Sequence, residues 1–181
     1  MNNLIKITLI SLLMVLASCN SEPSLQEYYI DHKETENFVA VDIPTSLIAP
    51  DTDMLTEEQK KVVNSVRKVN VLAYPLKNGD KATYDDEKAQ LAKVLKGDDY
   101  EELMTFGQPS QKMTLYLKGE EEAIDEVIFF GHDDEKGFVV ARVLGEDMNI
   151  SEIIRFAENM DTDGANINTA GLKGVMDIFD Q

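Results

Sequence analysis

The chain has 181 residues, of which 43% are hydrophobic, enough for one domain with a real core. Its formal net charge of −17 would repel phosphate backbones, which argues against nucleic acid as a partner. Anionic lipid headgroups would repel the same surface, and the single cysteine leaves no internal disulfide to support the fold.

The first 19 residues have the organisation of an export signal. Residues 1–6 carry one cation, Lys6, and residues 7–17 form an uninterrupted run of apolar and hydroxyl side chains. Spanning a bilayer takes about 20 residues, so this run is too short for that and suits a signal peptide instead. It ends in Leu16-Ala17-Ser18-Cys19, which resembles the lipobox of bacterial lipoproteins. The resemblance implies that residues 1–18 are removed and that the Cys19 sulfur carries a diacylglycerol.

Residues 19–24 are therefore expected to be a lipidated cysteine followed by a polar tether. Several acyl chains anchor a protein stably, because each buried methylene contributes about 0.8 kcal/mol. No aspartate follows Cys19, which favours the outer membrane over the inner membrane. The alternatives are an ordinary secretory signal with an incidental cysteine, or an uncleaved membrane anchor.

Four helices are predicted in a domain spanning residues 25–160. They cover 25–33, 57 to about 67, 84–96, and a segment that starts after residue 149. Three of them begin with the pattern of a capping box, in which two side chains satisfy the free N–H groups of the first turn. These boxes pair Ser24 with Glu27, Thr56 with Gln59, and Asn149 with Glu152, while Thr83 caps the third helix.

Five strands are predicted, at 38–43, 69–74, 112–118, 126–130 and 138–144. A helix separates the first two, which indicates a parallel βαβ unit. The last three are close in sequence, which indicates an antiparallel meander. We therefore expect an α+β fold: a single two-layer domain in which helices pack on a mixed five-stranded sheet.

Residues 161–181 are expected to form a tail with a short terminal helix, because apolar residues recur between Leu172 and Phe179. Asp161-Thr162-Asp163-Gly164 has the pattern of the middle of an EF-hand loop. The closing glutamate of that motif is absent, so a weak calcium site remains only an alternative function.

The mature chain resembles a family of small exported proteins of Bacteroidota-type bacteria, known as domain of unknown function 4252. The likeness covers roughly residues 25–160. It rests mainly on Tyr100-Glu-Glu-Leu-Met104 and on Arg142-Val-Leu-Gly145 at a strand end. The resemblance implies a cell-envelope location, often with a lipid anchor, and it brings no substrate or catalytic residue.

The turn between the last two strands predicts which side chains share a face. Symmetric closure around Asp134 places Ile128, Phe130, Phe138 and Val140 on one side, with Glu126 and Arg142 as an ion pair of about 0.2–1 kcal/mol at its end. The other side has no charge and is expected to pack against the helices; it carries Val127, Phe129, Val139, Ala141 and Val143. Met113, Leu115 and Leu117 of the preceding strand are expected to join it. The first side is either covered by the chain's own first helix or tail, or open as a partner-docking surface formed by Ile128, Phe130, Phe138 and Val140.

No catalytic, cofactor or metal motif is found. His32 and His132 have no second histidine spaced to help them hold a metal, and His132 is expected in a solvated turn. No carboxylate pair stands out among the 34 acidic residues. We therefore expect a non-enzymatic, membrane-anchored module that binds an envelope protein or peptide. A carboxylate-dependent envelope hydrolase is a further alternative.

Overall fold

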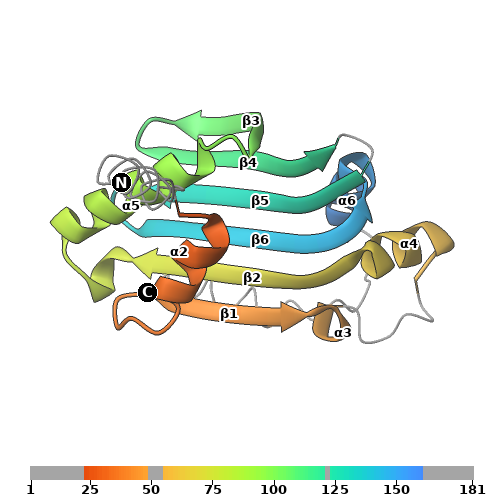
Figure 1. Ribbon diagram of the computed structural model, residues 1–181, viewed down its shortest axis with the longest axis horizontal. Helices are drawn as coiled ribbons and strands as arrows, with labels where there is room; N and C mark the ends of the chain where they lie inside the picture. The colour runs from red at the N-terminus through yellow and green to blue at the C-terminus, as the bar shows by residue number, and fades with distance from the viewer. Residues whose placement is uncertain (1–22, 49–54, 121–122, 161–181) are drawn as a thin grey trace, which may run out of the picture.

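The computed structural model describes residues 23–48, 55–120 and 123–160 (Figure 1). The helices are α2 (Leu25–His32), α3 (Thr45–Ile48), α4 (Glu57–Ser65), α5 (Lys81–Leu95) and α6 (Ile150–Met160), with the 3-10 helix η2 at Leu76–Asn78. The strands are β1 (Val39–Pro44), β2 (Val66–Pro75), β3 (Glu101–Gln108), β4 (Gln111–Glu120), β5 (Ala123–Asp133) and β6 (Gly137–Met148).

The strands form one sheet in the order β1-β2-β6-β5-β4-β3, and every neighbouring pair is antiparallel. The α+β class and the antiparallel meander β4-β5-β6 are confirmed. The prediction of five strands in a mixed sheet is wrong, because the sheet has six strands and no parallel pair among the described residues.

The parallel βαβ unit is the first error. The helix between the first two strands was expected to cross the sheet, but α4 packs at one end of the sheet against α6 and β6. The chain therefore enters β2 from the end at which it left β1, and Val41 pairs with Val71 in an antiparallel register. A connecting helix specifies a parallel pair only when it lies along the face of the sheet.

The missing strand is β3, at the sheet edge. Seven of its eight residues are exposed. The strand therefore lacks the regular alternation of buried and exposed side chains from which a half-buried strand is predicted. Its position comes from pairing with β4, in which Phe106 lies opposite Met113.

The predicted helix starts are largely confirmed. The hydroxyls of Ser24 and Thr56 accept hydrogen bonds from the third residue of α2 and α4, in complete capping boxes. The Asn149 side chain accepts a bond from the Glu152 N–H at 3.1 Å. The start of α5 differs, because Asp80 is its cap and accepts from the Thr83 N–H at 3.0 Å.

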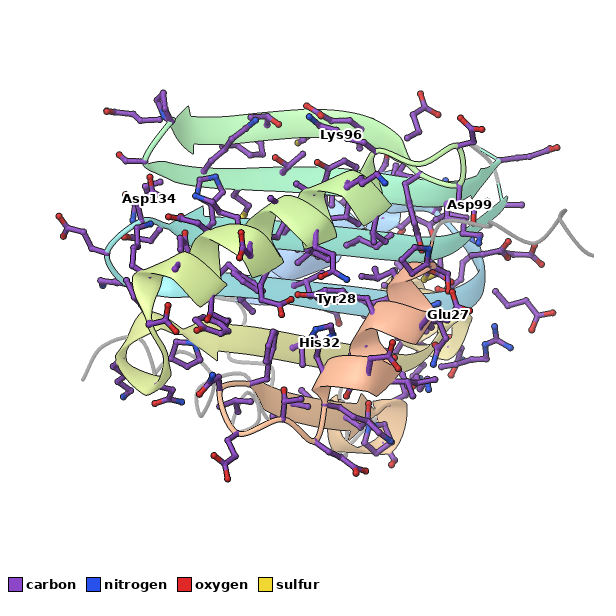
Figure 2. All side chains as sticks on the ribbon, turned by 60° about the vertical axis from the view of Figure 1, so that its left-hand side comes forward. Glu27, Tyr28, His32, Lys96, Asp99 and Asp134 are labelled. Carbon is purple, nitrogen blue, oxygen red and sulfur yellow. The ribbon has the colours of Figure 1, made fainter. Side chains whose placement is uncertain are left out.

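The two faces of the sheet are covered differently. In Figure 1, α2 and α5 lie over the front of the sheet, and α6 lies behind it at one end. We call the front the helix-covered face; Figure 2 shows α2 and α5 side by side on it, with Tyr28 and His32 on α2. Ile150 and Ile153 of α6 pack on the other side, the opposite face, against a cluster that includes Leu115 and Val127.

The assignment of faces in the β5–β6 hairpin is the second error. Phe130 lies opposite Val140, two positions away from the predicted pairing with Phe138, so the same residues still share a face. That face, however, lies under α2 and α5. Both sides of the hairpin are apolar, so alternation cannot indicate which side the helices cover. The predicted partner surface is therefore wrong, because its members are core residues that are at most 5% exposed: Ile128, Phe130, Phe138 and Val140.

Candidate binding groove

A groove of about 450 Å³ lies at one end of the opposite face. Four residues in register cross the sheet there: Phe106, Met113, Gly131 and Val139. Gly131 has no side chain, so the space between its two neighbours is not filled. The groove is lined by Phe106, Gly107, Gln111, Lys112, Met113, Gly131, His132, Asp133, Lys136, Gly137, Phe138 and Val139.

Exposed apolar side chains concentrate beside this groove. Phe106 is 57% exposed and Met113 is 50% exposed, and both line the groove. Leu103 of the same hairpin is 41% exposed but does not belong to the lining. In the described part of the chain, the other large hydrophobic residue with comparable exposure is Ile30 of α2, at 51%. An apolar cluster of this kind beside a hollow is typical of a binding surface.

Two tight turns hold the walls of the groove. Gly107 has a φ of 98°, and a Cβ there would lie 2.2 Å from the Gln111 carbonyl oxygen, so only glycine fits. At the other turn, the Asp133 carboxylate accepts hydrogen bonds from the backbone N–H groups of Glu135 and Lys136, at 2.8 and 3.2 Å. Both walls are therefore defined by backbone hydrogen bonds and turn geometry.

Charged residues also belong to the lining of the groove. Lys112 and Lys136 line the groove together with one carboxylate, Asp133. Asp133 is engaged, because it also accepts a bond from the Gln111 side chain at 3.1 Å. Alternation along β4 directs the Lys112 side chain to the helix-covered face, whereas Met113 faces the groove.

His132 lies on β5 and not in the turn. Its side chain is 12% exposed, its Nδ1 makes no hydrogen bond, and that atom lies 3.7 Å from the Asp134 carboxylate. Burial lowers its pKa below the ordinary value, and the charge of Lys88 lowers it further. The prediction of a solvated histidine was wrong, because the strand extends three residues beyond its expected end at residue 130.

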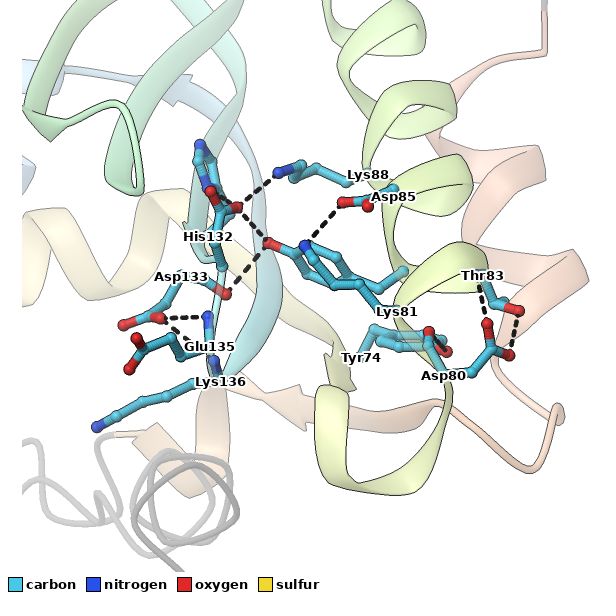
Figure 3. Close-up of polar contacts among 12 residues, drawn as sticks. Tyr74, Asp80, Lys81, Thr83, Asp85, Lys88, His132, Asp133, Glu135 and Lys136 are labelled. Atoms are coloured by element: carbon cyan, nitrogen blue, oxygen red, sulfur yellow. Dashed lines mark hydrogen bonds and ion pairs between the residues drawn. The ribbon is translucent and has the colours of Figure 1, made fainter.

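The turn next to His132 joins β5 to α5. Lys88 and the Asp134 carboxylate form an ion pair of 2.7 Å, and the Tyr84 hydroxyl donates to the Asp133 carbonyl at 3.1 Å. Figure 3 shows His132 beside this ion pair and Lys88 reaching over from α5. These contacts link α5 to the β5–β6 hairpin, so Lys88, Tyr84 and Asp134 have a structural role.

The other histidine also lies between elements. His32 Nε2 is 3.2 Å from Glu87 of α5, and the Tyr28 hydroxyl donates to the same carboxylate at 2.9 Å. Burial and the Glu87 charge strongly raise the pKa of Tyr28. Tyr28, Tyr29 and Tyr116 are all buried, so none of them offers an exposed ring for stacking on a ligand.

Residues 23–48, 55–120 and 123–160 contain no group of three or more His, Cys, Asp or Glu placed to hold a metal ion. No helix in these ranges has both the length and the hydrophobicity needed to cross a membrane. Cys19, the Asp161–Gly164 pattern and the predicted tail at 161–181 lie outside the described residues.

Comparison with known proteins places the groove inside a family domain. The family model described as a domain of unknown function (DUF4252) matches residues 28–156. The chain belongs to this family. No curated protein and no solved structure shows significant similarity to it.

The DUF4252 match runs from α2 into α6 and includes all six strands. Both hairpins that form the groove are therefore part of the family domain. Residues 161–181 follow the matched region. The sequence resemblance is confirmed as far as the family is concerned, and the lipid anchor and envelope location remain predictions.

The groove was missed from sequence for two reasons. Phe106 was not assigned to a strand, and Met113 was expected to join the face buried under the helices. One signal was available: Gly131 interrupts an otherwise apolar strand, and an isolated strand glycine often marks a bulge or a place where another group approaches the backbone.

Proposed function

We propose that this DUF4252 chain is a lipid-anchored, non-enzymatic binding protein of the bacterial cell envelope. Its ligand is an apolar segment of an envelope protein or peptide, bound in the groove between the β3–β4 and β5–β6 hairpins. The observation that carries the proposal is the pair of exposed apolar side chains that line a 450 Å³ hollow, Phe106 and Met113.

The shape of the groove supports a peptide ligand. Among the described residues, the edge strand β3 pairs only with β4, so the outer side of its backbone can pair with an added strand. An apolar side chain of such a strand could fill the space above Gly131.

The position of α2 agrees with an anchor on Cys19. Residues 20–24 lead directly into α2, which lies on the helix-covered face. The groove lies on the opposite face, so a tether attached to α2 would leave it unobstructed. The sequence after Cys19 favours the outer membrane, as argued above.

Changing Cys19 to serine is expected to abolish lipid attachment and processing, because the diacylglycerol is carried on the sulfur. The precursor would then keep residues 1–18 and migrate as a longer chain. Mass spectrometry of the wild-type mature protein checks this directly. An unmodified Cys19 thiol in that protein would contradict the anchor.

A photo-crosslinking amino acid at Met113 is expected to capture a defined envelope protein or peptide in intact cells. Ile30 provides a matched control, because it is 51% exposed against 50% for Met113 but lies on α2. Crosslinks from Met113 and none from Ile30 would place the partner at the groove.

The yield of the product that is crosslinked to Met113 should depend on Phe106. Phe106→Asp replaces an exposed apolar side chain, so stability should change by no more than about 0.5 kcal/mol. The yield from Met113 should fall about tenfold, since losing a buried aromatic contact costs more than 1.4 kcal/mol. Identical products from Met113 and Ile30, or an unchanged yield in Phe106→Asp, would disprove binding at the groove.

A further inference from the structure

The two edges of the sheet differ in how they are protected against an added strand. Exposed sheet edges are usually blocked by charged residues, by proline or by a bulge. The β1 edge contains Asp42 and ends at Pro44. The first half of β3 contains two glutamates and a bulge between Glu102 and Met104. The second half, residues 104–108, has no charge, no proline and no bulge.

This unprotected half of β3 offers two kinds of contact to an extended chain. Figure 1 shows β3 as the outermost strand, and no described element lies beyond it. In an antiparallel pair, alternate residues direct their backbone N–H and C=O groups away from the partner, so an edge strand keeps groups that can accept a further strand. Phe106 lies in the middle of this half, and its exposed ring lines the groove.

An exposed negative charge lies on the same face as the Phe106 ring. Phe106 is opposite Met113 of β4. Glu101 is opposite Leu117, four positions further along β4 and therefore on the same face. Four steps along a strand correspond to about 13 Å. The exposed Glu101 is thus placed to contact an extended chain that also contacts Phe106.

We propose that the ligand of the groove binds as an added strand along residues 104–108 of β3. It carries an apolar residue opposite Phe106 and, about four positions away, a basic residue opposite Glu101. This inference rests on the proposed function, because it specifies the ligand of the same groove.

Charge separates this ligand from a second copy of the chain. A chain of net charge −17 attracts a basic segment over a distance, and Glu101 adds a local contact for it. Two copies of the chain would repel each other at the same edge. Each copy would also bring its own bulge in β3, which shortens the stretch that can pair.

Two synthetic nine-residue peptides serve as probes, and the full-length lipidated protein in detergent micelles is the receptor. Both peptides alternate threonine with apolar residues and contain one phenylalanine; four positions from it, one has lysine and the other glutamate. Fluorescence anisotropy at low salt gives the two dissociation constants. The lysine peptide is expected to bind more tightly, because its charge is opposite to that of Glu101 and of the whole chain.

A charge reversal on β3 separates the local contact from the overall charge. Glu101→Lys should reduce the preference for the lysine peptide at least about fivefold, because it turns an attraction into a repulsion at an exposed site. Glu58→Lys is the matched control: it makes the same change in net charge at an exposed position on α4 and should not alter the preference by that amount.

Hydrogen exchange of the backbone amides distinguishes an added strand from a contact between side chains alone. With the lysine peptide bound, alternate amides among residues 104–108 should exchange at least about tenfold more slowly, because they become hydrogen-bonded. The amides of Val41 and Ile43, in the strand at the other edge, should exchange at unchanged rates.

Each contrary result has one meaning. The same peptide preference in the wild type and Glu101→Lys, or an equal reduction in Glu58→Lys, would overturn the basic contact. Unchanged exchange at residues 104–108, or no binding of either peptide, would overturn the added strand. Protection of these amides in the free protein would assign the edge to a second copy instead. The proposed function itself is tested separately, by the crosslink from Met113 in cells.

Discussion

Replacing Arg142 with methionine is expected to lower the free energy of unfolding by about 3–5 kcal/mol, because it leaves a buried carboxylate unpaired. Arg142 and Glu126 are each only 7% exposed, and they form two hydrogen bonds of 2.9 and 2.5 Å. The Gln26 side chain of α2 accepts a further bond from the guanidinium. The pair is thus enclosed between the sheet and α2.

A double-mutant cycle measures this coupling. Glu126→Gln should also be strongly destabilising, because it leaves the guanidinium without a charged partner. Combining Arg142→Met with Glu126→Leu should restore much of the stability, since a buried ion pair can often be exchanged for apolar residues at little cost. Chemical unfolding of the four proteins gives the coupling energy. Two small, additive effects of less than about 1 kcal/mol would show that the pair is solvated, as expected for a surface pair.

Raising the pH above 10 is expected to unfold the chain cooperatively. Burial is the main cause that raises the pKa of every tyrosine in the chain, and it brings Tyr29 and Tyr100 to about 12. The unfolded chain releases its tyrosine protons near pH 10, whereas the folded chain keeps them. The other tyrosines with raised pKa values are Tyr28, Tyr74, Tyr84 and Tyr116.

The direction of this effect follows from proton binding. Below pH 10 both states hold the tyrosine protons, and the stabilisation is complete. Between pH 10 and 12 a tyrosine whose pKa in the folded chain is about 12, such as Tyr29 or Tyr100, costs the folded state about 1.4 kcal/mol per pH unit. Domains have about 5–15 kcal/mol of stability, so several tyrosines together should bring the unfolding midpoint below about pH 12.

Circular dichroism and tyrosinate absorbance, followed on the same sample, check the prediction. The two signals should change together in one steep transition. Tyr28→Phe should make the loss of stability with pH less steep, although it removes the hydrogen bond to Glu87. Tyrosinate absorbance that rises gradually around pH 10 in a folded chain would contradict the buried environment of these side chains.

Local signals in the sequence determined the positions of most elements. A capping box involves residues only three positions apart, so Ser24 with Glu27 and Thr56 with Gln59 could be recognised without the fold. The position of the β5–β6 hairpin could be predicted in the same way, because its turn depends on Asp133 and on Gly137, whose φ is 128°. The start of α5 was misjudged because Asp80 and Thr83 are both good capping residues.

Tertiary structure alone decided which face of the sheet the helices cover. Alternation places Phe130 and Phe138 on one side and Val139 on the other, but both sides are apolar. The choice depends on the large side chains that α2 and α5 bring from elsewhere in the sequence, such as Tyr28 and Tyr84. No local pattern around residues 126–144 contains that information.

The candidate groove likewise depends on the tertiary structure. It requires that β3 pair with β4, that Gly131 fall in register between Met113 and Val139, and that no described helix cover this end of the opposite face. Each condition depends on contacts between residues distant in sequence. The helix caps could be predicted from the chain itself because short segments specify them, and the export signal and lipobox, which stay predictions, rest on segments of the same kind. A binding surface exists only after the strands are aligned.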